Sequence, residues 1–228
     1  LLGCFELEAK PWGMQGIPED FCSDALPDDF AHFEPILETA IRRFPELGDA
    51  GINLFFNGPE SFTADDRYLL GPTPELDNLF VACGFNSIGI QSAGGAGKVL
   101  AQWMHQGSPP IDLWDVDVRR TFPFQSQRDF LFERTKETLG LLYDMHWPHR
   151  QYATSRNVRL SPLHRTTSQL GAVMGELAGW ERPNWYAENE PAEYQYTYGK
   201  PNWFEACQRE CDAIANHVAL FDQSSYPI

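Results

Sequence analysis

The chain has 228 residues, of which 43% are hydrophobic and 21% charged, so it suits one large domain or parts of two and is not a bulk-disordered protein. Its 17 basic and 32 acidic residues give a formal net charge of −15. Nucleic acids and anionic membranes bind cationic faces, so we expect neither as a partner. Five scattered cysteines without a C-x-x-C pair indicate free thiols in a reducing compartment.

The first part of the chain predicts one helix among short strands. Residues 10–27 are rich in turn formers and predict a connecting loop. A helix is expected from Pro27, with Asp28 and Asp29 in its first turn, where acidic side chains are favourable. Its apolar residues recur at helical intervals, at Phe33, Ile36, Leu37, Ala40, Ile41 and Phe44. Strands are expected at residues 1–8, 51–59, 66–72 and 78–83, the last of them central in a sheet because it is continuously apolar.

The second part of the chain predicts further helices and a strand. Residues 98–104 and 128–145 have helical spacing of apolar residues, and residues 108–110 are linker-like. Residues 147–161 are irregular, and a strand at residues 171–177 precedes a loop rich in Trp, Pro and Tyr. Asn202, with Glu205 three residues later, predicts the capped start of a helix that runs to about Ala219. The mixture predicts an α+β fold.

The segment from Gly84 to Lys98 is the densest functional signal in the sequence. An apolar strand leads into a glycine-rich turn, and the turn leads into a helix. Glycine lets the backbone approach a ligand closely, and the free N–H groups at a helix start carry partial positive charge. An anion, or a ring that becomes anionic, would be stabilised there. The alternative is a tight packing turn between a strand and a helix.

Other kinds of site fit the sequence poorly. The run ends in Gly-Lys as a phosphate P-loop does, but Ser92 stands where the first glycine belongs and Val99 where a hydroxyl should bind magnesium. His146 and His149 flank a proline and have no cysteine or carboxylate cluster nearby, so no metal site is expected. Residues 78–97 are uncharged but too rich in glycine and polar residues for a membrane span.

Five arginines could form a carboxylate-binding group. In this acidic chain we expect them to form internal salt bridges instead; they are Arg119, Arg120, Arg150, Arg156 and Arg159. The chain has no initiator Met and no visible targeting signal, so we expect it to be an internal piece of a longer polypeptide.

Eight short motifs occur in the order of one known family. NGPESFT (57–63), YLLG (68–71), PELDNLF (74–80) and the 84–98 run resemble the C-terminal part of the flavin domain of dimethylglycine dehydrogenase and sarcosine dehydrogenase. LWDVDVRR (113–120) resembles the start of the family's small central domain. SPLH (161–164), AGWERPNW (178–185) and LFDQSS (220–225) resemble the opening of its folate-binding, aminomethyltransferase-like domain.

The resemblance implies three domains and an activity. The expected parts are the C-terminal part of an amine-oxidase-type FAD domain at 1–108, a small central domain at 109–160 and the start of the aminomethyltransferase-like domain at 161–228. The whole protein would be an FAD-dependent amine dehydrogenase or oxidase that demethylates an N-methylated glycine, dimethylglycine or sarcosine. The one-carbon unit would pass to tetrahydrofolate as co-substrate, and this piece alone would be inactive.

The resemblance also implies where the flavin lies. The expected cofactor-binding residues are Gly84, Phe85, Asn86, Ser87, Ile88, Gly89, Ile90 and Gln91, whose backbone would face the isoalloxazine ring. Asn86 and Ser87 would supply polar side-chain contacts, and Lys98 would either reach further polar atoms or lie on the helix surface. Related amine oxidases carry a substrate-facing histidine where Phe5 stands here, so the catalytic residue is unassigned.

Two alternatives come from the same resemblance. The regulatory subunit of pyruvate dehydrogenase phosphatase shares the architecture without catalysis, and a flavin oxidase of another N-methyl amine would share most of the motifs. The electron acceptor is left open. The compartment would be the cytoplasm in a bacterium or the mitochondrial matrix otherwise.

Overall fold

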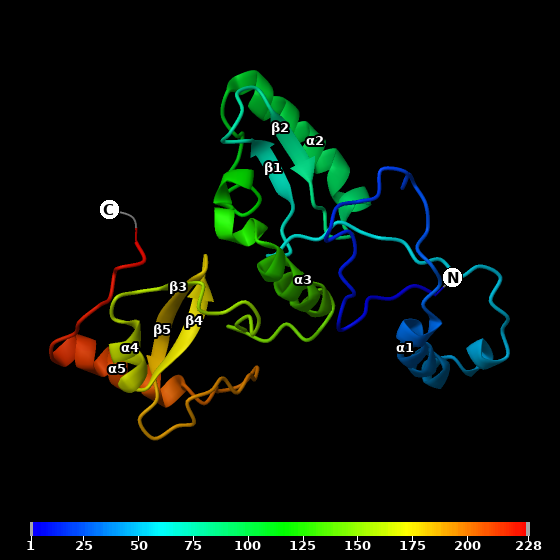
Figure 1. The fold of residues 1–228 in the computed structure, drawn as a ribbon. Coiled ribbons are helices and arrows are strands. Elements are labelled where there is room, and N and C mark those ends of the chain that lie inside the picture. The colour runs from blue at the N-terminus through cyan, green and yellow to red at the C-terminus, as the bar shows by residue number, and fades with distance from the viewer. Residues whose placement is uncertain (1, 227–228) are drawn as a thin grey trace. The chain divides into compact units, whose positions relative to one another are not determined.

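A computed structural model describes residues 2–226, and the chain divides into two compact units. The first ends at Asp144 and the second begins at Met145 (Figure 1). The first unit contains α1 (Phe30–Arg43), β1 (Leu69–Pro72), β2 (Phe80–Cys83), α2 (Gly89–Gln106), α3 (Arg128–Leu142) and the 3-10 helices η1 (Pro45–Gly48), η2 (Val118–Arg120) and η3 (Pro123–Ser126). The second contains β3 (Arg159–Leu160), α4 (His164–Gln169), β4 (Ala172–Leu177), β5 (Trp180–Tyr186) and α5 (Phe204–Asn216). The predicted mixture of helices and strands is confirmed.

Helix α1 is confirmed, but it starts at Phe30 and not at Pro27, so Asp29 is its N-cap and neither Asp28 nor Asp29 lies in its first turn. The side chain of Asp29 accepts a hydrogen bond from the His32 N–H at 3.1 Å, which satisfies one of the free donors at the helix start. Arg42 and Arg43 lie in the last turn, where cations complement the helix dipole. The predicted apolar residues within the helix are half-buried, whereas Phe44 just beyond it is exposed. The helix is therefore amphipathic, with a modestly covered face.

Strands β1 and β2 form a two-stranded antiparallel sheet, in which Leu69 pairs with Cys83 and Pro72 with Phe80. The prediction that residues 78–83 lie at the centre of a sheet is wrong, because β2 has one partner strand among the described residues. It is β1 that has neighbours on both sides. The Leu70 N–H donates to the Val116 carbonyl at 2.8 Å, and Leu70 is almost fully buried.

Helix α2 begins nine residues earlier than predicted. It starts at Gly89 and contains the glycines that were assigned to the turn. It packs on the sheet through Trp103, which is buried. Gly71 in β1 has a left-handed backbone (φ +114°), and a Cβ atom there would lie 2.8 Å from the Trp103 ring. Glycine at position 71 therefore permits both the strand geometry and the helix contact.

Two predicted strands of the first unit do not form. Residues 2–8 run irregularly beside α3, where Leu7 lies so close that a Cβ atom on Gly140 would be 2.0 Å from the Leu7 carbonyl oxygen. Residues 51–59 form only an isolated bridge, between Asn57 and Leu26. Leu54 is 80% exposed. A strand needs a partner strand for its backbone groups, and neither segment has a partner strand among residues 2–226.

Helix α3 is confirmed, although it ends at Leu142, three residues earlier than predicted. Phe130, Arg134 and Thr138 are buried at four-residue intervals, together with Leu139 and Gly140. The Thr138 hydroxyl lies within hydrogen-bond distance of two backbone carbonyls, that of Arg134 at 2.7 Å and that of Ala64 at 3.2 Å, and shares its one proton between them. This contact joins α3 to the segment that precedes β1.

The second unit is a three-stranded sheet in the order β3-β5-β4. The antiparallel β4–β5 pair closes through Ala178 and Gly179, which both have positive φ, as a type I′ turn requires. The predicted loop after residue 177 is therefore wrong for residues 180–186, which form strand β5, and is confirmed from residue 187 to the start of α5. Pro183 is tolerated where the register shifts by a bulge.

Helix α5 packs on this sheet around Trp185, which is 1% exposed and contacts Trp203, Ala206 and Val173. The predicted cap is wrong. The N-cap is Trp203, and the Asn202 amide instead accepts from the Gln195 N–H at 3.1 Å. That side chain holds the preceding aromatic loop rather than the helix start.

Candidate functional site

The backbone of the predicted cofactor-binding turn is sharply reversed. Gly84, Asn86 and Ser87 have φ values of +63°, +49° and +65°. Such left-handed conformations are open to glycine, tolerable for asparagine and costly for serine. Some contact outside the turn must therefore hold it in this shape.

The holding contact is made by Asn86 and Thr63. The Asn86 side-chain oxygen accepts from the Thr63 backbone N–H at 2.8 Å, and its amide nitrogen donates to the Thr63 hydroxyl at 3.1 Å. The Asn86 N–H also donates to the Ser61 carbonyl at 3.2 Å. Asn86 is 2% exposed. Its side chain is thus used inside the protein and anchors the turn to the 61–63 segment.

Thr63 also closes the loop that follows it. Its hydroxyl donates to the Arg67 carbonyl at 3.0 Å and accepts from the Arg67 N–H at 3.1 Å. On the other side, a Cβ atom on Gly84 would lie 2.7 Å from the Thr63 methyl group, so the turn passes Thr63 closely only because residue 84 is glycine. Thr63 therefore links the turn at Asn86 to the loop of residues 63–67, which leads directly into β1.

The opposite side of the turn presents backbone donors and apolar atoms. Ile88 is the N-cap of α2 and, among the described residues, no side chain caps the helix. The N–H groups of Gly89, Ile90 and Gln91 have no acceptor within the helix, as at any helix start. The Ile90 side chain is fully exposed. Phe85 stacks on Tyr68 with ring centroids 4.8 Å apart.

This donor set fits the pyrimidine edge of a flavin, which gains negative charge on reduction and accepts backbone hydrogen bonds. Ser87 does not contribute a free hydroxyl, because its side chain donates to Glu60 at 3.0 Å. The Asn86 and Ser87 side chains, which were expected to contact the ligand, make their polar contacts within the protein, and the N–H groups of residues 89–91 remain for a ligand.

Two further positions were singled out in the sequence. Lys98 is exposed on α2, as its alternative interpretation has it. Phe5 is half-buried and stacks on Tyr143 with centroids 4.5 Å apart. Within residues 2–226 no group of three or more His, Cys, Asp and Glu side chains could hold a metal ion.

Three of the five arginines form salt bridges, as predicted: Arg119 with Asp117, Arg120 with Asp65 and Arg156 with Glu181. Burial opposes ionisation of Asp117, but hydrogen bonds from the Arg119 side chain and backbone hold its pKa below the ordinary value. Asp117 is 5% exposed, so this charge is kept inside the protein by its partner.

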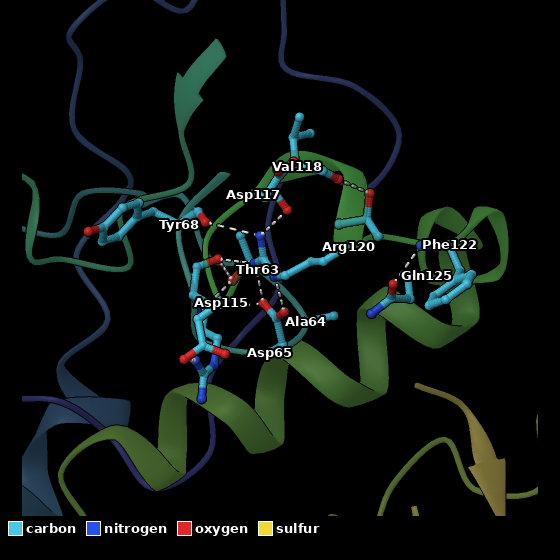
Figure 2. Close-up of polar contacts among 12 residues, drawn as sticks. Thr63, Ala64, Asp65, Tyr68, Asp115, Asp117, Val118, Arg120, Phe122 and Gln125 are labelled. Carbon is cyan, nitrogen blue, oxygen red and sulfur yellow. Dashed lines mark hydrogen bonds and ion pairs between the residues drawn. The ribbon is translucent and has the colours of Figure 1, made fainter. Parts of the chain in front are cut away.

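The Arg120–Asp65 pair is the feature that the sequence did not reveal. Figure 2 shows the Arg120 side chain directed between Asp65 and the Tyr68 backbone. The two residues are 55 positions apart, and neither belongs to a local pattern that predicts the contact. The signal available was an Arg-Arg pair next to two aspartates in the 113–120 motif.

The five cysteines are unpaired in the structure, which agrees with the predicted free thiols. No helix in the described part of the chain has the length and apolar character needed to span a bilayer.

Three family models match successive parts of the chain. They are described as FAD dependent oxidoreductase for residues 13–103, FAD dependent oxidoreductase central domain for residues 106–161, and GCVT N-terminal domain for residues 163–227. Together these ranges include most of the chain.

Curated relatives align over nearly the whole chain. The 4-methylaminobutanoate oxidase (formaldehyde-forming) of Paenarthrobacter nicotinovorans is 46% identical over 99% of this chain and 27% of its own length. The mitochondrial pyruvate dehydrogenase phosphatase regulatory subunit of Mus musculus is 36% identical over 99% of this chain and 26% of its own. The mitochondrial sarcosine dehydrogenase of Homo sapiens is 33% identical over 96% of this chain and 27% of its own. The chain thus spans about a quarter of each of these relatives.

Proposed function

The chain belongs to the family of FAD-dependent oxidoreductases that includes sarcosine and dimethylglycine dehydrogenases, and we propose that the full-length protein oxidises the N-methyl group of a small amino acid. The observation that carries the proposal is the turn at residues 84–91. Hydrogen bonds between Asn86 and Thr63 hold the turn in its left-handed conformation. No side chain among the described residues caps the start of α2, so its first backbone N–H groups are available to a ligand.

The bound flavin would accept hydride from the substrate N-methyl carbon. The part assigned to this chain is electrostatic. The backbone N–H groups of residues 89–91 and the positive end of α2 would stabilise negative charge on the reduced ring. Asn86 and Gly84 keep these donors in place before the cofactor arrives, so little reorganisation is needed at the moment of reaction.

The substrate is proposed as a class with three members. Sarcosine and dimethylglycine follow from the family motifs, and 4-methylaminobutanoate is added because the oxidase named for it is 46% identical to this chain. We propose residues 161–228 as the start of a folate-binding domain, which would pass the one-carbon unit to tetrahydrofolate. The formaldehyde-forming relative offers the alternative that the carbon is released as formaldehyde.

The proposed domain limits are 1–108, 109–160 and 161–228. The ranges matched by the three family models support this division. For the compartment, a bacterial cytoplasm and a mitochondrial matrix both stay open, since the relatives include proteins of both origins.

The first experiment is a visible absorption spectrum of the full-length protein, followed by anaerobic addition of each of the three amines. We expect a flavin spectrum that one amine bleaches. Product analysis with and without tetrahydrofolate then separates methylene-tetrahydrofolate from formaldehyde. A protein without flavin would overturn the proposal and favour the regulatory role, for which the 36% identical regulatory subunit is the precedent.

The turn itself is tested by Gly89→Leu. A Cβ atom at Gly89 would meet only Phe85, at an ordinary 3.5 Å, so the variant should fold, and its side chain would lie at the first of the N–H groups proposed to face the ligand. We expect loss of bound flavin. Gly97→Leu in the same helix is the matched control, because no described atom lies within 4 Å of a Cβ there. Full flavin content and turnover in Gly89→Leu would remove the turn from the cofactor site.

A further inference from the structure

We infer that Arg120 is a positioning residue for the flavin-facing turn, acting through Asp65, Arg67 and Thr63. The inference rests on the proposed function, because it concerns how the same turn is held. Arg120 lies in the range matched by the central-domain model, whereas Thr63 and Asn86 lie in the range matched by the oxidoreductase model. The central domain would therefore help to set the geometry of the cofactor site.

The Arg120 side chain is fully committed to this contact. A guanidinium has five N–H donors, and five hydrogen bonds are formed. Two reach the carboxylate of Asp65, at 2.8 and 2.9 Å. Three reach the carbonyls of Arg67, Tyr68 and Asp117, at 2.6, 3.2 and 3.2 Å. The side chain is 9% exposed, so water replaces few of these bonds if they are lost.

Four of the five hydrogen bonds of Arg120 go to one short segment, and the fifth goes to Asp117. Asp65, Arg67 and Tyr68 follow directly on Thr63, and Figure 2 shows the segment facing Arg120. A second tie reinforces it, since Arg67 pairs with Asp115 at 2.6 Å. Both ties begin in the 113–120 motif, so this motif holds the segment after Thr63 at two points.

The hold continues to the turn through a shared carbonyl. The Arg67 carbonyl accepts from Arg120 at 2.6 Å and from the Thr63 hydroxyl at 3.0 Å. The same hydroxyl accepts from the Asn86 amide at 3.1 Å. Moving the Arg67 carbonyl would therefore disturb the hydroxyl that keeps the buried Asn86 in its left-handed conformation. The path from Arg120 to the turn has three hydrogen bonds.

Lysine cannot replace this arginine. Its ammonium has three donors and no planar fork, so it cannot hold a carboxylate by two bonds and reach three carbonyls as well. Arg120→Lys keeps the charge and most of the length, and so isolates the geometry. Arg119→Lys is the matched control. Arg119 is the adjacent residue and pairs with Asp117, but its side chain is half-exposed and makes none of the contacts with residues 63–68.

The experiment is hydrogen exchange on the full-length protein, with and without FAD. The reporters are the Asn86 and Ile88 N–H groups, which donate to Ser61 and Phe85. We expect Arg120→Lys to speed their exchange at least tenfold in both forms, while Arg119→Lys changes it less than threefold. The midpoint potential of the flavin should shift in Arg120→Lys and not in Arg119→Lys, which a merely stabilising residue would not produce.

Thr63→Val tests the path independently, should Arg120→Lys yield no folded protein. It removes the shared hydroxyl but leaves Arg120 untouched, and we expect the same loosening of residues 86–88. Faster exchange at Tyr68 with wild-type exchange at Asn86 in the folded variants would overturn the inference. If the protein binds no FAD, the proposed function fails, whereas the exchange in the FAD-free form still decides whether Arg120 positions the turn.

Discussion

Replacing Glu181 by glutamine should open the sheet of the second unit. Glu181 lies in β5, the central strand, and is 3% exposed. Its carboxylate accepts from the Arg156 Nε at 2.8 Å, from the Arg156 Nη2, and from the Asn157 backbone N–H at 2.7 Å. Arg156 also donates to the Met174 carbonyl in β4 at 3.2 Å. The pair thus joins the irregular segment before β3 to two strands.

The expected cost follows from these contacts. Glutamine keeps the shape and one acceptor oxygen, but its NH₂ group faces a donor of Arg156. At least one charge-assisted hydrogen bond, worth about 1.5–3 kcal/mol, is lost, and Arg156 keeps a partly buried charge without its counter-ion. Breaking a buried pair on one side typically costs about 3–5 kcal/mol. We expect about 3 kcal/mol, which corresponds to opening that is roughly 100-fold more frequent.

Native-state hydrogen exchange of the full-length protein measures this opening strand by strand. The amides of β4 and β5 should exchange about 100-fold faster in Glu181→Gln. Glu188→Gln is the control with the same chemical change, because the Glu188 side chain is 68% exposed and its ion pair with Arg209 spans 3.5 Å. Its effect should stay within about 0.5 kcal/mol.

The same pair predicts a dependence on pH. Burial of Glu181 raises its pKa, but hydrogen bonds from Arg156 and Asn157 outweigh burial and hold the pKa below the ordinary value of 4.5. The pair's contribution is therefore complete above pH 4.5 and is lost as the pH falls from there through the lowered pKa. Glu181→Gln should lack this acid-dependent loss. Equal exchange in wild type and Glu181→Gln at neutral pH would refute the reasoning.

The remaining predictions concern the first unit. Gly140→Ala should destabilise α3 and displace the N-terminal segment, because the new Cβ atom would lie 2.0 Å from the Leu7 oxygen; a lower melting temperature in thermal unfolding would show this. Gly97→Ala is the control, since its Cβ atom meets no described atom within 4 Å, and it should raise the free energy of unfolding by about 0.5–1 kcal/mol through helix propensity. Asn86→Ala should cost more than Asn86→Gly in urea unfolding, by about 1 kcal/mol, because both lose the Thr63 contacts and only glycine accepts the left-handed backbone freely; equal costs would mean that the backbone is not held left-handed.

Local patterns in the sequence were enough for the elements whose stability is local. Helix α1 followed from Asp29 at its start and from apolar residues at helical spacing, and both signals act within one or two turns. The family motifs likewise predicted a sequence of domains, since motif order is a property of the chain alone. The internal pairing of the arginines followed from the excess of acidic residues.

Elements that depend on a distant partner could not be predicted in this way. Residues 1–8 and 51–59 have strand-like composition, but the described residues 2–8 and 51–59 form no strand, because no neighbouring segment pairs with them beyond the single bridge of Asn57. Strand β5 contains a proline and a buried glutamate, and only the tertiary structure supplies the bulge that accommodates Pro183 and the Arg156 side chain that pairs with Glu181. Helix α2 begins at Gly89, nine residues before its predicted start, and the turn before it is held by a contact with Thr63 that the local sequence does not reveal.

The candidate site shows the same division most clearly. Its glycines and its place between a strand and a helix are visible in the sequence, because close backbone approach and a helix start need those residues. The role of Asn86 was decided by Thr63, 23 positions away, and that of Arg120 by Asp65, 55 positions away. A side chain's hydrogen-bond partners depend on which backbone segments the fold brings within 3 Å, and only the tertiary structure determines that.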